Sequence, residues 1–218
     1  FMILPLYSVM RVIPPGVDLD RFHGPDGSEP ASAIARSLAR FLDDPAKPVI
    51  LALSRPDPRK NIITLIDAFG GSSRLQDLAN LVIVAGNRDD IAEMDAGGRD
   101  VLTEILLAID RHDLYGKVAY PKHHQADEVP VLYRLAALRG GVFVNPALTE
   151  PFGLTLLEAA ASGLPVVATE DGGPRDVIEN CRNGHLVDPL DAEGMAQALR
   201  RVLEDREHRR ALALNGLE

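Results

Sequence analysis

Residues 142–161 read VFVNPALTEPFGLTLLEAAA and contain one complete strand–loop–helix unit. The run at 142–145 is apolar on both faces, as in a parallel strand that helices cover on either side. From residue 154 to residue 161, leucines and alanines follow helical spacing, and Gly153 stands at the predicted start of that helix. The stretch therefore predicts a buried strand that leads through a loop into a helix.

The same alternation extends over most of the chain. Four other short apolar runs read as buried strands, at 49–54, 81–86, 117–120 and 165–169. Segments with helical spacing lie between or beside these strands, at 31–42, 61–69, 101–111, 127–138 and 175–179, and the tail at 192–214 reads as two helices broken near Asp205. Strand–helix alternation of this kind predicts right-handed βαβ units and a single doubly wound, Rossmann-like α/β domain with a parallel sheet. Ligands bind such sheets at the carboxyl ends of the strands, so the loops that follow the strands are the candidate functional segments.

Composition narrows the possible partners. The chain has 218 residues, 46% hydrophobic and 25% charged, which is typical of a globular domain. A net charge of −9 argues against nucleic-acid binding. Its apolar runs are shorter than the roughly 18 residues of a membrane span, so no membrane partner is expected. The single cysteine, Cys181, cannot form a disulfide within the chain, and we expect a cytoplasmic location.

The loop after the first strand is rich in proline and cations. It reads SRPDPRKN at 54–61, and Arg55 and Lys60 flank the turn. Both could reach an anion above the sheet edge, where one charge-assisted hydrogen bond contributes roughly 1.5–3 kcal/mol. The alternative is a solvated basic turn.

The loop after the fourth strand offers a second anion site. The first-turn amides of the helix that Gly153 opens lack partners within that helix, and its dipole is positive there. Glu150 precedes this helix and Glu158 lies one turn inside it, among apolar residues. Glu158 is either a desolvated carboxylate with a partner or the polar edge of the helix.

Two further loops are candidates for ligand contact. Residues 120–125 read YPKHHQ, but no carboxylate or histidine follows His123 and His124 at metal-ligand spacing, so a loop that touches a ligand fits better than a metal site. Residues 171–174 read DGGP, where paired glycines either admit a ligand close to the backbone or simply form a tight turn. Neither a G-x-G-x-x-G fingerprint after the first strand nor a P-loop motif is present.

Together these loops resemble a known family. The segment 146–158, with glutamates eight apart around Phe-Gly-Leu-Thr, resembles the donor-site signature of retaining glycosyltransferases that have two Rossmann-like domains (the GT-B type). The turn at 55–61, the entry strand at 12–18 and the segment 184–189 resemble the same group, in the expected order. Within it, residues 54–57, 120–124 and 145–147 look most like sucrose-phosphate synthases, enzymes of sucrose biosynthesis.

The resemblance implies a role for each site residue. It implies that the chain is a hexosyltransferase domain that takes glucose from UDP-glucose to fructose 6-phosphate. The implied catalytic residues are Glu150, Arg55 and Lys60. The implied donor-binding residues are Arg55, Lys60, His123, Glu150, Phe152, Gly153, Leu154, Thr155 and Glu158. No cofactor and no essential metal are expected.

The resemblance also implies what the chain lacks. The family binds its sugar-phosphate acceptor on an N-terminal domain, so residues 1–218 would form the donor-binding domain, with 1–18 as an entry segment from that other domain. The isolated domain is then expected to bind nucleotide sugar without transferring it. Alternatives are a related synthase with GDP-mannose as donor or fructose as acceptor, and a nucleotide-binding module without catalysis.

Overall fold

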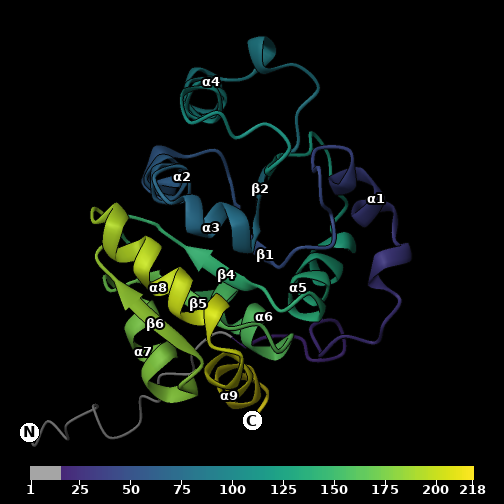
Figure 1. Ribbon diagram of the computed structural model, residues 1–218, viewed down its shortest axis with the longest axis vertical. Helices are drawn as coiled ribbons and strands as arrows, with labels where there is room; N and C mark the ends of the chain where they lie inside the picture. The colour runs from purple at the N-terminus through teal and green to yellow at the C-terminus, as the bar shows by residue number, and fades with distance from the viewer. Residues whose placement is uncertain (1–15) are drawn as a thin grey trace, which may run out of the picture.

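The computed structural model describes residues 16–218. The predicted entry strand lies mostly outside these residues. Within them, six parallel strands form one sheet in the order β3-β2-β1-β4-β5-β6 (Figure 1). The strands are β1 (Val49–Ser54), β2 (Asn80–Ala85), β3 (Val118–Ala119), β4 (Val142–Asn145), β5 (Val166–Thr169) and β6 (Gly184–Val187). This confirms the predicted doubly wound α/β fold.

Helices cover both faces of the sheet, as Figure 1 shows. The helical segments are η2 (Glu29–Ala31), α1 (Ala33–Ala39), η3 (Pro58–Lys60), α2 (Ile62–Gly70), α3 (Ser73–Leu78), η4 (Ile91–Glu93), α4 (Ala96–Arg111), α5 (Glu128–Leu138), α6 (Leu154–Ala161), α7 (Gly173–Cys181), α8 (Ala192–Glu204) and α9 (Arg206–Leu217). Aspartates are the N-cap residues of α4, α8 and α9: the side chains of Asp95, Asp191 and Asp205 accept a hydrogen bond from the N–H of the third residue of each helix. Each such cap satisfies an amide that the helix itself leaves unpaired.

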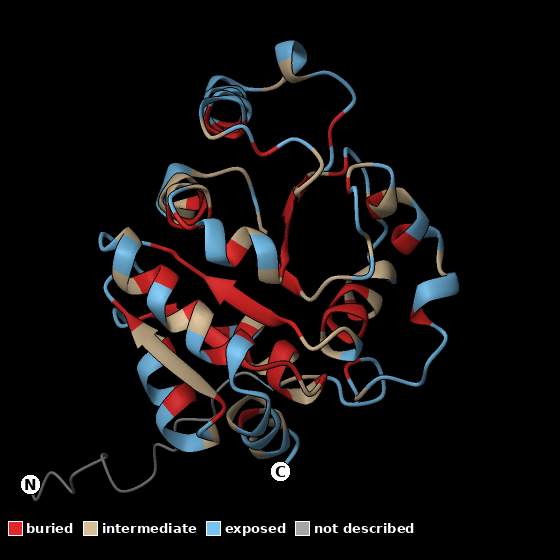
Figure 2. Cartoon of the chain, in the orientation of Figure 1, coloured by how far each residue is buried: buried red, intermediate tan, exposed pale blue. Residues whose placement is uncertain are grey.

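The core is divided between the two faces by strand alternation. Ile50 and Ala52 of β1 pack with helices α2, α3, α4 and α8, whereas Val49 and Leu51 pack with α1, α5, α6 and α7. Successive strand residues point to opposite faces, so a strand covered on both sides has to be apolar throughout. Figure 2 shows the inner strands buried and the edge strand β6 only partly buried.

Most predicted elements are confirmed, with shifted ends. The predicted helix at 101–111 begins five residues earlier, at Ala96, because Asp95 caps it. The predicted strand at 117–120 shortens to two residues in β3, and the predicted helix at 31–42 becomes α1 after the single turn η2. The prediction missed α3 and β6, which have only six and four residues.

The strand order predicts where on the sheet a ligand should bind. From β1 the chain adds β2 and β3 toward one edge of the sheet, and from β4 it adds β5 and β6 toward the other edge. The neighbouring strands β1 and β4 are therefore the topological switch point, where the direction of strand addition reverses. Connections leave the carboxyl ends of these two strands toward opposite faces, and a crevice opens between them. The loops after β1 and β4 are the two that the sequence predicted to carry Arg55, Lys60 and Glu150.

Candidate functional site

A pocket of about 360 Å³ lies at this switch point. It is lined by Ala52, Leu53, Ser54, Arg55, Lys60, Ile62, Gly86, His124, Val144, Asn145, Pro146 and Thr155. The lining thus combines the ends of β1, β2 and β4, the histidine loop and the first turn of α6. Two basic side chains, Arg55 and Lys60, lie beside a mainly apolar lining. Such a lining with a few polar groups is typical of a small-molecule site.

Lys60 and Glu150 form the charged centre of the site. Lys60 Nζ donates to Glu150 Oε2 at 2.9 Å, although the residues are 90 positions apart, and Asn145 Nδ2 approaches the same oxygen at 3.3 Å. The side chains are only 27% and 14% exposed. Burial alone would raise the Glu150 pKa, but the hydrogen bonds from Lys60 and Asn145 outweigh it and lower the pKa. Glu150 is therefore an ionised acceptor, oriented by its partners.

The Glu150 loop is held by close backbone contact. Glu150 bridges to Gly172, and the Gly173 N–H donates to the Glu150 carbonyl at 2.8 Å. A Cβ at Gly172 would lie 2.3 Å from that carbonyl oxygen, and φ there is +92°. Glycine is thus required at residue 172 to let the two loops touch. In this structure the paired glycines pack against the Glu150 loop.

The first turn of α6 (Leu154–Ala161) lies at the edge of the site. Gly153, with φ of +80°, is the N-cap residue of the helix. Its N–H approaches Glu150 Oε1 at 3.4 Å, and Thr155 lines the pocket. The predicted helix thus begins directly after Gly153, and Thr155 brings its first turn to the pocket, as expected.

The three cations of the loop after β1 differ in their surroundings. Arg59 donates to the Asp57 carboxylate at 2.6 Å, and its side chain is 71% exposed. That bidentate pair lowers the Asp57 pKa and holds Arg59 away from the pocket. Arg55 is exposed at the mouth and lines the pocket with Lys60. Arg55 and Lys60 are thus the cations placed to meet an anion.

The histidine loop is fixed by Asn87, a residue that the sequence did not single out. Asn87 Nδ2 donates to the His124 carbonyl at 3.0 Å, and the His124 N–H donates to Asn87 Oδ1 at 2.8 Å. Buried Arg88 adds bonds to the carbonyls of Tyr120 and Pro121. As a result His124 lines the pocket, whereas His123 lies outward, 3.3 Å from Asp89. Burial lowers the His124 pKa, so the imidazole is neutral near pH 7.

Glu158 lies on the inner side of α6, with a partner. Tyr133 Oη, which is fully buried, donates to Glu158 Oε2 at 3.1 Å. Burial raises the Glu158 pKa, and the Tyr133 hydrogen bond and the Arg21 charge offset only part of that rise. Of the two alternatives predicted for Glu158, a desolvated carboxylate with a partner or the polar edge of the helix, the structure shows the first. Glu158 does not line the pocket.

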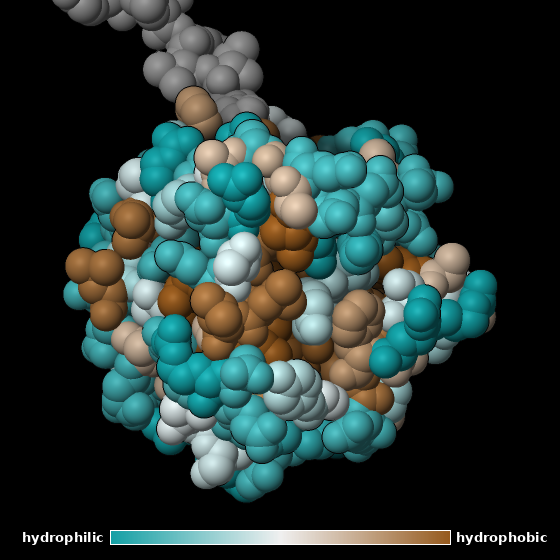
Figure 3. Space-filling model, turned by 90° about the horizontal axis from the view of Figure 1, so that it is seen from above, coloured by the Kyte–Doolittle hydropathy of each residue, from teal (hydrophilic) through white to brown (hydrophobic). Residues whose placement is uncertain are grey.

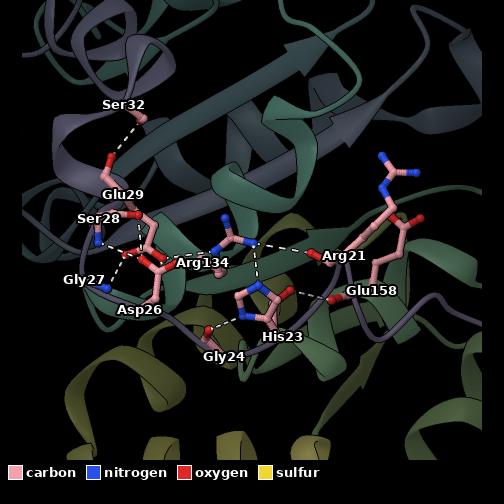
Figure 4. Close-up of polar contacts among 11 residues, drawn as sticks. Arg21, His23, Gly24, Asp26, Gly27, Ser28, Glu29, Ser32, Arg134 and Glu158 are labelled. Carbon is pink, nitrogen blue, oxygen red and sulfur yellow. Dashed lines mark hydrogen bonds and ion pairs between the residues drawn. The ribbon is translucent and has the colours of Figure 1, made fainter.

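A loop beside Glu158 is anchored by a buried ion pair, drawn in Figure 4. Arg134 Nε donates to Glu29 Oε1 at 3.0 Å, and the same carboxylate accepts the N–H groups of Asp26 and Gly27 at 3.0 Å each. Glu29 is fully buried, and these three donors satisfy its charge. Residues 21–29 are thereby fixed against α5, next to Glu158.

The structure brings most of the predicted site residues together. Arg55, Lys60 and Thr155 line the pocket, and Glu150 contacts Lys60 directly. Phe152 and Leu154 lie exposed on the Glu150 loop and α6, 67% and 40% accessible, available to contact a bound molecule. On the face seen in Figure 3, hydrophobic residues gather near the centre, and hydrophilic residues cover most of the surrounding surface. The individual roles that the resemblance implied stay predictions.

Two negative findings apply to the described residues. Across 16–218, no group of three or more histidine, cysteine, aspartate or glutamate side chains is placed to hold a metal ion. No helix in that part of the chain is both long and apolar enough to cross a membrane.

Comparison with known proteins identifies relatives over nearly the whole chain. The chain is 52% identical over 222 residues to the probable sucrose-phosphate synthase 1 of Oryza sativa subsp. indica, and 51% identical over 226 residues to the sucrose-phosphate synthase of Zea mays. These alignments cover 95% of the chain but only 20% and 21% of the relatives. The chain therefore spans about a fifth of the length of these relatives.

Solved structures show the same architecture. Sucrose-phosphate synthase from Thermosynechococcus elongatus superposes with a TM-score of 0.78 at 30% identity, covering 95% of the chain and 46% of that structure. HepE from Anabaena, in complex with UDP-glucose, superposes with a TM-score of 0.74 at 23% identity, covering 93% of the chain and 50% of HepE. The second likeness supports the fold alone. The family model for "Glycosyl transferases group 1" matches residues 32–218, and the chain belongs to that glycosyltransferase family.

Proposed function

We propose that this chain is the donor-binding domain of a retaining glycosyltransferase that moves glucose from UDP-glucose to fructose 6-phosphate, as in a sucrose-phosphate synthase. The observation that carries the proposal is the pocket at the β1/β4 switch point, where Arg55 and Lys60 meet Glu150 and the first turn of α6. The identity of about 50% to sucrose-phosphate synthases supports the choice of donor and acceptor. The acceptor would bind on a second domain.

The geometry suggests how the donor would lie. Arg55, Lys60 and the α6 amides at Leu154 and Thr155 would hold the diphosphate. Departure of UDP leaves negative charge on that diphosphate, and cations and amides that are already oriented stabilise it without reorganising. The Lys60 charge also offsets Glu150, which would otherwise repel the phosphates.

The remaining groups would serve the sugar, the ribose and the base. Glu150, with the backbone of Phe152 and Gly153, would face the transferred glucose, where a carboxylate stabilises positive charge that develops on the sugar ring. Glu158 would accept the ribose hydroxyls, since one carboxylate can accept both. The loop that carries His123 and neutral His124 would contact the uracil.

Calorimetry tests the donor directly. Titrating the chain with UDP, GDP, UDP-glucose and GDP-mannose should give measurable heats for the two uridine compounds and a much weaker response for the guanosine compounds. A preference for GDP or GDP-mannose would overturn the proposed donor, and no binding of any of the four would overturn the proposed site.

UDP binding is expected to be independent of divalent metal. Arg55, Lys60 and the α6 amides already supply a positive field, so no ion is needed to neutralise the diphosphate. UDP titrations with excess EDTA and with added Mg²⁺ should give dissociation constants that agree within about twofold. Loss of a metal that held the diphosphate would raise the dissociation constant far more, since one charge-assisted bond contributes roughly 1.5–3 kcal/mol. A loss of binding on chelation would contradict this expectation.

Glu158→Gln is expected to weaken UDP binding at pH 7.5 by roughly three- to tenfold, because an amide oxygen replaces a charged acceptor for the ribose hydroxyls. The difference between wild type and Glu158→Gln should then shrink as pH falls. Protonation of Glu158 removes the same charge, and its raised pKa makes this happen above the usual glutamate range.

Calorimetry at pH 7.5, 6.5 and 5.5 on both proteins measures that difference. Phosphate protonation affects both proteins equally and cancels in the ratio. A ratio that grows as pH falls, or a Glu158→Gln variant that loses as much affinity for pyrophosphate as for UDP, would contradict the ribose role.

A further inference from the structure

Asn61 lies where the loops after β1, β4 and β6 meet. It separates η3 from α2 and has left-handed backbone angles, φ 54° and ψ 35°. Few residues other than glycine adopt these angles readily, and asparagine is one of them. The backbone at this position turns the chain sharply, directly after Lys60.

The Asn61 side chain connects this turn to two other loops. Its Nδ2 donates to the Pro146 carbonyl at 2.9 Å and to the Pro189 carbonyl at 2.7 Å, and its Oδ1 accepts the Thr64 hydroxyl at 2.7 Å. Both carbonyls require a donor, so the amide nitrogen has to face them. Pro146 follows β4 and Pro189 follows β6, which means that one amide fixes the turn after β1 to both loops.

A second link lies on the other side of Lys60. The Leu148 N–H donates to the Arg59 carbonyl at 2.9 Å. Lys60 is thus flanked by Arg59 and Asn61, and each of these neighbours is hydrogen-bonded to the loop that carries Glu150. These two links fix the chain on either side of Lys60 to the loop that carries Glu150.

We propose that Asn61 is a positioning residue for the diphosphate: its amide clamps the loops after β1, β4 and β6 so that Lys60 is held ready beside Glu150 and α6. The proposal rests on the proposed function, because it takes the anion at Lys60 to be the donor diphosphate. Pre-oriented groups bind and stabilise charge better than groups that must first be ordered. Loss of the clamp should therefore affect the diphosphate and leave the nucleoside part of the site intact.

Asn61→Gly isolates the side chain from the backbone. Glycine accepts the left-handed angles, so the variant removes the three hydrogen bonds without adding backbone strain. Asp113→Gly is the matched control, since Asp113 also has a positive φ, of 49°, and lies outside the pocket lining. Thr64→Val is a milder variant that removes only the bond to Asn61 Oδ1.

The probes are UDP and pyrophosphate by calorimetry and uridine by NMR titration, with thermal unfolding as a check on folding. Asn61→Gly should raise the dissociation constants of UDP and pyrophosphate about tenfold, the size of effect expected when a binding group loses its supporting contacts. Uridine affinity should stay within about twofold of wild type, since the clamp does not touch the base loop. Asp113→Gly should match wild type for all three probes.

Two results would overturn the clamp: unchanged pyrophosphate affinity in Asn61→Gly, or an equal loss for uridine and pyrophosphate. If Asn61→Gly does not fold, Thr64→Val takes its place as the test. A smaller loss of affinity that is confined to UDP and pyrophosphate supports the clamp, and an unchanged pyrophosphate affinity overturns it. Failure of the proposed function looks different. In that case the wild-type chain binds UDP no more tightly than pyrophosphate. The effect of Asn61→Gly on pyrophosphate affinity still tests the clamp.

Discussion

Replacing Lys60 with alanine is expected to raise the dissociation constant of UDP by roughly ten- to a hundredfold, the equivalent of one charge-assisted hydrogen bond. The loss has two parts. The diphosphate loses a cation, and Glu150 loses the partner that donates to it at 2.9 Å. Without the Lys60 charge, the Glu150 carboxylate would then repel the nearby phosphates.

Calorimetry on Lys60→Ala measures the total loss, and the double variant Lys60→Ala/Glu150→Gln separates its parts. The double variant should recover a portion of the lost affinity, because it removes the uncompensated carboxylate. Arg59→Ala is the matched control, since Arg59 is the neighbouring cation but pairs with Asp57 and faces solvent. An Arg59→Ala loss as large as that of Lys60→Ala would mean that general positive charge, and not Lys60, holds the ligand.

The chain by itself is expected to form sucrose 6-phosphate at least about 10⁵-fold more slowly than a two-domain sucrose-phosphate synthase. Each residue for which we propose a role is proposed to serve the nucleotide or the donor sugar, and none is proposed to serve the acceptor. Holding donor and acceptor in register can contribute roughly 7–11 kcal/mol to a transfer reaction. An open crevice also admits water, which weakens the action of Arg55 and Lys60 on the departing diphosphate.

The assay should follow sucrose 6-phosphate and released UDP separately, with UDP-glucose and fructose 6-phosphate present. UDP release without sugar-phosphate product indicates hydrolysis of the donor and agrees with the expectation. A two-domain relative at the same concentration is the positive control. Sucrose 6-phosphate formed by the 218 residues at a comparable rate would show that they also bind the acceptor productively.

The long elements of the fold could be predicted from sequence because each has a clear period. Strand β1 is apolar on both faces, and α4 and α5 repeat apolar residues at helical spacing over several turns. Strand β6 has no such signal: it is a half-exposed edge strand of four residues that begins with Gly184. A Cβ at that glycine would lie 2.1 Å from the Val166 carbonyl oxygen, a constraint visible only once the two strands are side by side.

The charged part of the site was also predictable, for a topological reason. Arg55, Lys60 and Glu150 follow strands whose carboxyl ends share one edge, so their proximity follows from the parallel sheet. The supporting contacts were not predictable. Neither Asn61, the first residue of a predicted helix, nor Asn87 is marked as a contact residue by the sequence, and backbone partners of the two lie 85 and 37 positions away. Similarly, the Asn87 and Arg88 bonds that hold the histidine loop, with His124 and not His123 at the pocket, are visible only in the structure.

The parallel seam between β1 and β4 divides the described sheet into two continuous pieces of chain. Strands β1 to β3 come from residues before 120, and β4 to β6 come from residues after 141. Only two residue pairs, Ile50 with Val142 and Leu51 with Phe143, define the register across the seam. Because Lys60 belongs to the first piece and Glu150 to the second, the charged centre is complete only when the two pieces have joined. A molecule bound there would contact both pieces, so its binding free energy would add to the stability of the joined, folded domain.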